Sequence, residues 1–289
     1  MSIKRYSIPF LFIAPSLVLF FVFCFIPIIA AFFVSLTDWG LRGASFVGFR
    51  NYVELARDPL FLRSLKNTFY FTFVGVPLSV LSGLATAILL NSSLVRVKTL
   101  FRTGFFLPVV TNLVACGVVW RWLYNPQYGI IKWFLEIFHI TSPNWLGDPK
   151  WAMPAIILMA IWRNFGYSMV IFLAGLQAIP KRFYEAAVID GANSFKSFLH
   201  ITLPLLKPTT VFVCIITTIG YFQLFAEPYI MTNQGGPVNS TLSVVLYLYK
   251  NGFKFFRFGY ASAIAYILFF IIFIFSLLQL RFIRHGVEY

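Results

Sequence analysis

Residues 8–36 read IPFLFIAPSLVLFFVFCFIPIIAAFFVSL and contain no charged side chain. The hydrocarbon core of a bilayer is about 30 Å thick, and a helix needs roughly 20 apolar residues to cross it. Lys4 and Arg5 precede the run as in a signal peptide, but the run is longer than the apolar core of such a peptide and lacks a convincing cleavage site. We therefore expect a retained membrane helix, kinked near Pro15 or Pro27.

The composition extends this interpretation to the whole chain. Of its 289 residues, 60% are hydrophobic and 11% are charged, whereas soluble domains carry about 25% charged residues. The formal charge of +14 comes from basic residues scattered between apolar runs, so anionic lipid explains it better than nucleic acid. The cysteines sit in apolar stretches without CxxC spacing, and the histidines lie outside them, so no metal site is expected.

Six apolar runs are long enough to span a membrane. They cover residues 8–36, 69–90, 103–124, 151–176, 209–227 and 258–280. A seventh run, residues 241–249, is too short to span and is expected to be interfacial or re-entrant. No repeat links the two halves, which argues against secondary transporters built from inverted repeats. The sequence thus predicts an all-α integral membrane protein, with residues 1–289 forming one membrane domain.

The polar segment between the fourth and fifth runs is itself patterned. Residues 179–208 read IPKRFYEAAVIDGANSFKSFLHITLPLLKP. Pro180 suits a first helical position, Gly191 can end that helix in the left-handed conformation, and Asn193 or Ser194 can cap a second helix. We expect two short helices around a bend. Their apolar stripe, Val188, Ala192, Phe195 and Leu199, fits a partner groove, although an amphipathic helix on the membrane surface would show the same pattern.

This segment closely resembles the cytoplasmic EAA loop of permease subunits of binding-protein-dependent ABC importers. The matching positions are Glu185, Ala186, Ala187, Asp190, Gly191, Ala192, Leu203 and Pro204. Other stretches resemble the carbohydrate-uptake branch, the relatives of maltose and glycerol-3-phosphate permeases. These are Ala14-Pro15 with SLTDW at 35–39, LAGLQAIP at 173–180, and Phe225 with MTNQGGP at 231–237.

The resemblance implies a type I ABC importer permease fold with six transmembrane helices and a coupling loop at residues 180–208. It implies a bacterial or archaeal cytoplasmic membrane, with the loop and both termini cytoplasmic, an orientation that charge alone leaves open. The implied partners are a second permease subunit in a heterodimer, two ATPase subunits and an extracytoplasmic solute-binding protein. The short loop after the first run departs from maltose permease subunits that carry a large extra extracytoplasmic domain.

By this resemblance the chain imports a sugar, oligosaccharide or sugar-like solute by alternating access. It has no GxxxxGK[ST] phosphate loop, so it is expected to be no enzyme and to bind no cofactor. ATP and Mg would be used by the partner ATPase subunits. A self-sufficient ion-coupled carrier or channel is the alternative, while a membrane enzyme lacks a catalytic set of residues.

Polar residues inside the fourth and fifth runs are candidates for the solute path. They are Arg163, Asn164, Tyr167, Tyr221, Gln223 and Glu227. Arg163 lies about 18 Å along a helix from Trp151, near the middle of a bilayer, where it would line a path or tie helices together. Arg121 is flanked by aromatic residues and is expected to be a membrane anchor. Residues 235–237, GGP, predict a turn.

Overall fold

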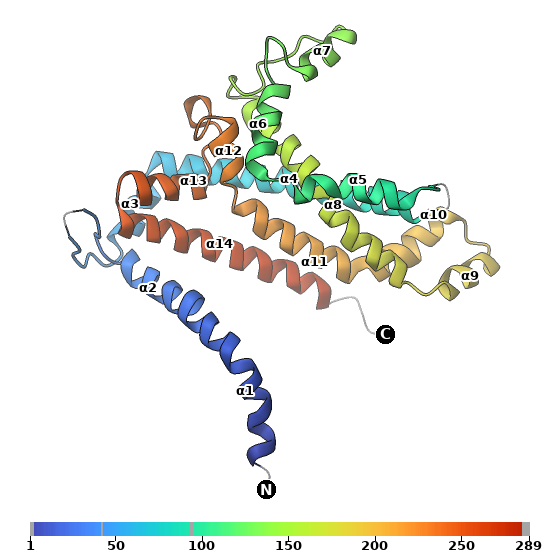
Figure 1. Ribbon diagram of the computed structural model, residues 1–289, viewed down its shortest axis with the longest axis horizontal. Coiled ribbons are helices and arrows are strands. Elements are labelled where there is room, and N and C mark those ends of the chain that lie inside the picture. Colours follow the sequence, from blue (N-terminus) through green and yellow to red (C-terminus); the bar gives the residue numbers. More distant parts are fainter. Residues whose placement is uncertain (1–2, 42, 93–94, 285–289) are drawn as a thin grey trace. The chain divides into compact units, whose positions relative to one another are not determined.

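The computed structural model describes residues 3–41, 43–92 and 95–284 (Figure 1). Apart from two isolated β-bridges, all regular structure in these residues is helical. The chain forms two compact units, Met1–Pro59 with Leu248–Phe269, and Leu60–Tyr247 with Phe270–Tyr289. Five described helices are long and apolar enough to cross a membrane, and a bent pair of helices makes a sixth if the pair is one span. The chain is thus a multi-pass membrane protein.

The first unit begins with the first predicted span. Its helices are α1 (Ile3–Phe20), the π-helical turn η1 (Phe21–Phe25), α2 (Ile26–Ser35), α3 (Arg50–Arg57), the π-helical turn η4 (Lys250–Lys254) and the start of α14 (Phe258–Arg284). α1 passes through Pro15 unbroken. The π-helical turn ends at Phe25, two residues before Pro27, and a wider turn there accommodates a residue that lacks an N–H group.

Side-chain hydrogen bonds hold α3 in the first unit. Asn51 is buried, and its Nδ2 donates to the Ser35 carbonyl at 2.8 Å and to the Thr37 carbonyl at 2.9 Å. On the same unit Tyr260 at the start of α14 donates its hydroxyl to the Asp58 carboxylate at 2.7 Å. These bonds fix the loop after α2 against both helices.

The second unit contains the remaining helices. They are α4 (Pro59–Asn91), α5 (Lys98–Val110), α6 (Leu113–Leu123), α7 (Ile130–Ile137), α8 (Ala152–Ala178), α9 (Arg182–Ile189), α10 (Ser194–Ser197), η2 (Phe198–Thr202), α11 (Leu203–Phe222), α12 (Ala226–Met231), η3 (Pro237–Asn239) and α13 (Val244–Tyr249). Its core centres on α8, whose residues Ile156, Met159, Met169 and Phe172 are fully buried.

Several expected boundaries need correction. α4 begins ten residues before the predicted second span, at Pro59, because Phe61 and Ser64 are buried and extend its packed face. The fifth span ends at Phe222, since Gln223 is the C-cap of α11, so Glu227 lies on the separate helix α12. The fourth and sixth spans agree with α8 and α14. The short seventh run forms α13, which is too short to span.

The third predicted span is not one straight helix. α5 and α6 are bent by 99° at Thr111 and Asn112. The Asn112 side chain accepts hydrogen bonds from the backbone N–H groups of Val114 and Ala115 at 2.8 and 3.3 Å. An asparagine at this position starts a new helix because its side chain satisfies the free N–H groups of the first turn. A hydropathy pattern does not reveal such a break, since α5 and α6 are both apolar.

Small residues let the helices of the second unit approach closely. A β-carbon on Gly166 of α8 would overlap the backbone carbonyl of Phe105 on α5. A β-carbon on Gly83 of α4 would lie 2.6 Å from the Ser168 Cβ. In a membrane the hydrophobic effect does not drive helices together, because lipid tails are as apolar as the helices. Membrane helices therefore gain stability from such close van der Waals packing. These glycines therefore bring α4 and α5 against the part of α8 that carries Arg163 and Tyr167.

Candidate functional site

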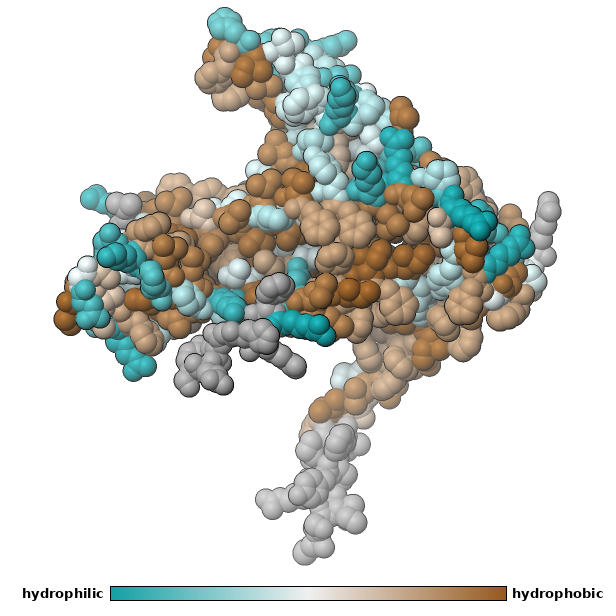
Figure 2. Space-filling view, turned by 180° about the vertical axis from the view of Figure 1, so that it is seen from behind, coloured by the Kyte–Doolittle hydropathy of each residue, from teal (hydrophilic) through white to brown (hydrophobic). Residues whose placement is uncertain are grey.

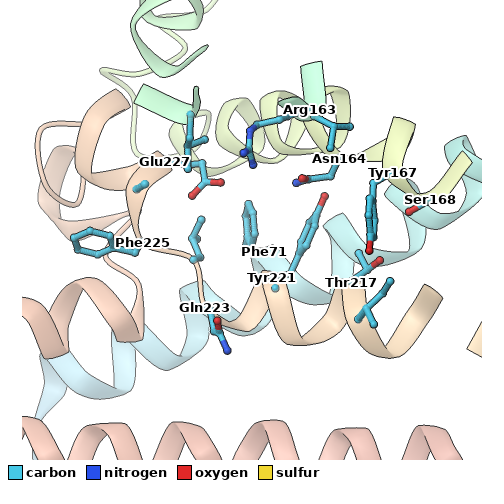
Figure 3. Close-up of a pocket in the computed structure, with 16 residues that line it drawn as sticks. Phe71, Arg163, Asn164, Tyr167, Ser168, Thr217, Tyr221, Gln223, Phe225 and Glu227 are labelled. Atoms are coloured by element: carbon cyan, nitrogen blue, oxygen red, sulfur yellow. The ribbon is translucent and has the colours of Figure 1, made fainter. Parts of the chain in front are cut away.

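A cavity of about 400 Å³ lies where α11 ends, against the middle of α8 and the break between α5 and α6 (Figure 3). Sixteen residues line it, and all six polar residues predicted for the solute path are among them. The lining consists of Phe71, Val109, Leu113, Arg163, Asn164, Tyr167, Ser168, Ile216, Thr217, Gly220, Tyr221, Gln223, Leu224, Phe225, Ala226 and Glu227. Their assignment to a solute path stays a prediction.

Two opposite charges face each other in this cavity. Arg163 extends from α8 toward the carboxylate of Glu227, which comes from the first turn of α12 (Figure 3). Burial raises the pKa of the Glu227 carboxyl, whereas the positive charge of Arg163 lowers it. The Arg163 Nε is buried and has no hydrogen-bond partner among the described residues. The guanidinium points into the cavity (Figure 3).

An aromatic wall forms one side of the cavity. The rings of Tyr221 and Phe71 stack with centroids 4.9 Å apart and planes at 27°. A β-carbon on Gly75 would overlap the Tyr221 ring, so the glycine makes room for it. The side chains of Ser79 and Asn164 lie beside the Tyr221 hydroxyl. The wall thus presents an apolar face with a polar edge.

The remaining predicted residues occupy different parts of the lining. The Tyr167 hydroxyl points toward α11, from which Thr217 also faces the cavity (Figure 3). Gln223 lies at the edge, and its amide points away from Arg163 and Glu227. The sequence interpretation missed Ser168 and Thr217. A helical repeat would have found both, because they stand four residues from Asn164 and Tyr221 respectively.

The predicted coupling segment bends at Gly191, which has φ of +75°. The Gly191 N–H donates to the Val188 carbonyl at 3.1 Å, and the Ala192 N–H donates to the Ala187 carbonyl at 2.8 Å. This pair of bonds is the Schellman motif that ends a helix. The predicted left-handed glycine is confirmed. Asn193 then caps the next helix by accepting from the Lys196 N–H at 2.8 Å, which confirms that start.

Two expectations about this segment were wrong. α9 begins at Arg182 rather than at Pro180. The second helix is not short, because Ser194–Phe222 is continuous through α10, η2 and α11. The motif residues Leu203 and Pro204 therefore stand at the start of a long spanning helix. The helix that follows the bend therefore ends beside the cavity.

One side of the coupling segment packs inward and the other is exposed. Ala187 is buried, and the Tyr184 hydroxyl bonds to the Thr202 Oγ1 at 2.9 Å, which fastens α9 to η2. Of the predicted stripe, Val188, Phe195 and Leu199 are exposed, whereas Ala192 is partly buried. Glu185, Ala186, Asp190 and Gly191 are exposed as well. In Figure 2 hydrophilic side chains gather around α9 and α10, at the left edge of the view.

Two further expectations concern single residues. Arg121 is exposed, and its Nη1 donates to the Ile230 carbonyl at 3.2 Å, so it links α6 to α12. Gly235 and Gly236 have positive φ angles, which confirms the predicted turn. Within the described residues no three His, Cys, Asp or Glu side chains are grouped closely enough to hold a metal ion.

Comparison with known families decides what this fold belongs to. The family model for the inner membrane component of binding-protein-dependent transport systems matches residues 55–285. The chain belongs to this family. This permease is similar to the lactose transport system permease protein LacF of Rhizobium radiobacter, with 40% identity over 96% of this chain and 95% of LacF. It is similar to the arabinooligosaccharides transport system permease protein AraP of Bacillus subtilis, with 38% identity over 96% of this chain and 89% of AraP.

A solved structure has the same fold as the permease. It is a bacterial alginate ABC transporter in complex with its alginate pentasaccharide-bound periplasmic protein, with a TM-score of 0.80 and 22% identity. The match covers 99% of this chain and 98% of that chain. The predicted all-helical fold of a type I ABC importer permease is therefore confirmed, as is the predicted membership of the importer family.

Proposed function

We propose that this permease subunit moves a sugar, oligosaccharide or sugar-like solute that an extracytoplasmic binding protein delivers. The observation that carries the proposal is the cavity at the end of α11. Its volume of about 400 Å³ is within the range of small-molecule sites, about 300–1,000 Å³. Two relatives are described as transport proteins for lactose and for arabinooligosaccharides, which supports a carbohydrate.

The chemistry of the cavity suits a sugar. Stacked Phe71 and Tyr221 offer an aromatic wall for the C–H faces of a pyranose ring. Asn164, Tyr167 and Thr217 offer neutral donors and acceptors for hydroxyl groups. A sugar needs both kinds of contact, because it is apolar on its ring faces and polar around its rim. We take Arg163, Asn164, Tyr167, Tyr221, Gln223 and Glu227 as the residues of the solute path, with Gln223 at its edge.

The exposed side of the coupling segment supports docking to an ATPase subunit. Val188 and Phe195 are 71% and 68% exposed, and clustered exposed apolar side chains on a polar loop are typical of an interaction site. The proposed assembly contains a second permease subunit in a heterodimer and two ATPase subunits that use ATP and Mg. The chain itself binds no cofactor. The coupling segment and both termini face the cytoplasm.

The continuous helix from Ser194 to Phe222 provides the mechanical link. When the ATPase subunits close around ATP, the docked α9 moves with them. The Gly191 bend and the Tyr184 bond to Thr202 pass that movement into α11. Because α11 ends at Gln223 beside the cavity, its movement changes access to the solute, and hydrolysis resets the arrangement.

The test uses the assembled transporter in proteoliposomes with its binding protein. Uptake should need ATP and stop with vanadate. Glu185→Lys and Gly191→Val should leave the subunits assembled. In both variants the amount of solute taken up per ATP hydrolysed should fall at least tenfold. Gly191→Asn is the matched control, because asparagine tolerates the left-handed conformation. Normal coupling in assembled Glu185→Lys and Gly191→Val transporters would contradict docking, and vanadate-insensitive uptake would indicate a self-sufficient carrier or channel.

A further inference from the structure

The charges in the cavity form a balanced pair. Among its sixteen lining residues Arg163 has the one basic side chain and Glu227 the one acidic side chain. Burial raises the pKa of the Glu227 carboxyl, and the facing Arg163 guanidinium lowers it and so favours the ionised form. When both groups are ionised, the lining has no net charge. The other polar residues are amides and hydroxyls. A solute inside this cavity is therefore exposed to one guanidinium and one carboxyl group, and every other polar group around it is uncharged.

The pair is not closed into a salt bridge. Salt bridges among the described residues join Arg50 to Glu54, Lys132 to Glu136 and Arg257 to Glu54, and Arg163 with Glu227 is not one of them. Both side chains point into the same space (Figure 3), and the buried Arg163 Nε has no partner there. A gap thus separates a donor group from an acceptor group across the cavity.

A sugar hydroxyl can satisfy both groups at once. Its oxygen accepts from the guanidinium, and its O–H donates to the carboxylate. An uncharged solute that bridges them leaves the charge balance intact. A carboxylate or sulfate on the solute would approach Arg163 but would add a second negative charge beside Glu227, and an unbalanced charge in a partly desolvated cavity is unfavourable. Specificity of this kind comes from repulsion of the wrong solute.

We propose that Glu227 is a specificity-determining residue, which together with Arg163 restricts the cavity to uncharged solutes and excludes anionic ones. This inference rests on the proposed function, because it assumes that the cavity is the solute path. It adds the substrate class, neutral rather than acidic sugars. Arg163 acts in the opposite direction and disfavours cations.

The charge preference can be measured without knowing the solute. Thr217 lines the cavity and is partly exposed, so Thr217→Cys places a thiol inside it. Cys24, Cys116 and Cys214 are replaced by alanine. The full chain, assembled with its partner subunits in detergent, is treated with two methanethiosulfonate reagents, one carrying a sulfonate and one a trimethylammonium group. The readout is the ratio of the sulfonate rate to the trimethylammonium rate.

Glu227→Gln should raise this ratio about fivefold, and Arg163→Gln should lower it about fivefold. A spherical cavity of about 400 Å³ is roughly 9 Å wide, and a unit charge at that distance in water changes the local concentration of each reagent about 2.2-fold. The changes are in opposite directions for the two reagents, so their ratio changes about fivefold. The double variant should return to the starting ratio. Glu136→Gln on α7 is the matched control, because Glu136 does not line the cavity, and it should leave the ratio unchanged.

An unchanged ratio in Glu227→Gln would overturn the inference. If that variant does not assemble, Arg163→Gln decides alone, and an unchanged ratio there has the same meaning. ATP-driven uptake in proteoliposomes is measured separately. Uptake that needs no ATP would overturn the proposed function while the reagent ratios still report on the cavity, so the two failures are distinguishable.

Discussion

The backbone of Gly166 on α8 lies directly against the carbonyl oxygen of Phe105 on α5, with no space for a side chain between them. The residues on either side of this contact in sequence include Asn164 and Tyr167, which line the cavity. The distance between two helices is therefore set at the same level of α8 as the candidate solute path. Helix packing and the lining of the cavity are therefore set at the same point of the fold.

Gly166→Ala should destabilise the second unit. The added methyl group must push α5 away from α8, and such overpacking costs about 1–3 kcal/mol. Gly104→Ala is the matched control on α5, because a β-carbon there meets no atom within 4 Å. We expect a lower unfolding temperature and lower membrane abundance for Gly166→Ala alone. Equal stability of the two variants would show that the helices are not held at this distance.

Asn51→Ala should destabilise the first unit. It removes the donor that serves the Ser35 and Thr37 carbonyls, and buried groups left without partners cost about 1–3 kcal/mol. Glu54→Gln, one turn further along α3, breaks only exposed salt bridges and should cost less than about 1 kcal/mol. Thermal unfolding of the purified variants measures both. A cost for Asn51→Ala no greater than that for Glu54→Gln would contradict the role of the asparagine.

Labelling should place the coupling segment and the turn at η3 on opposite sides of the membrane. Ile189 and Val238 are 86% and 71% exposed, so cysteines there are accessible without disturbing the packing. In a background without the three native cysteines, an impermeant thiol reagent should label Val238→Cys in intact cells. Ile189→Cys should react only after permeabilisation. Labelling of Ile189→Cys from outside would reverse the proposed orientation.

Arg163→Ala should impair uptake more strongly than Gln223→Ala. The guanidinium of Arg163 points into the cavity, whereas the amide of Gln223 points away from it (Figure 3). We expect at least a tenfold loss of uptake for Arg163→Ala and less than threefold for Gln223→Ala, with normal co-purification of the ATPase subunits. If Arg163→Ala instead prevents assembly of the subunits, Arg163 is a structural residue. Equal losses of uptake in the two variants would show that Arg163 contributes no more to the solute path than Gln223.

Much of this protein could be predicted from its sequence alone. The spans follow from local hydropathy, because each apolar run must find lipid or protein whatever its neighbours are. The bend at Gly191 and the cap at Asn193 also follow from local chemistry, since a glycine is the favoured left-handed residue and an asparagine satisfies the N–H groups of the next turn. Arg163 was identifiable as a functional candidate because a charge inside an apolar run is costly.

Other features were decided only by the tertiary structure. Arg163 and Glu227 are far apart in the chain, and their facing positions depend on how α8 packs against α12. The room for Tyr221 depends on Gly75 of α4, and the tight approach at Gly166 depends on α5. The 99° break between α5 and α6 separates two halves that hydropathy cannot tell apart. Hydropathy and capping act within a few residues, whereas a cavity exists only where surfaces from several helices meet.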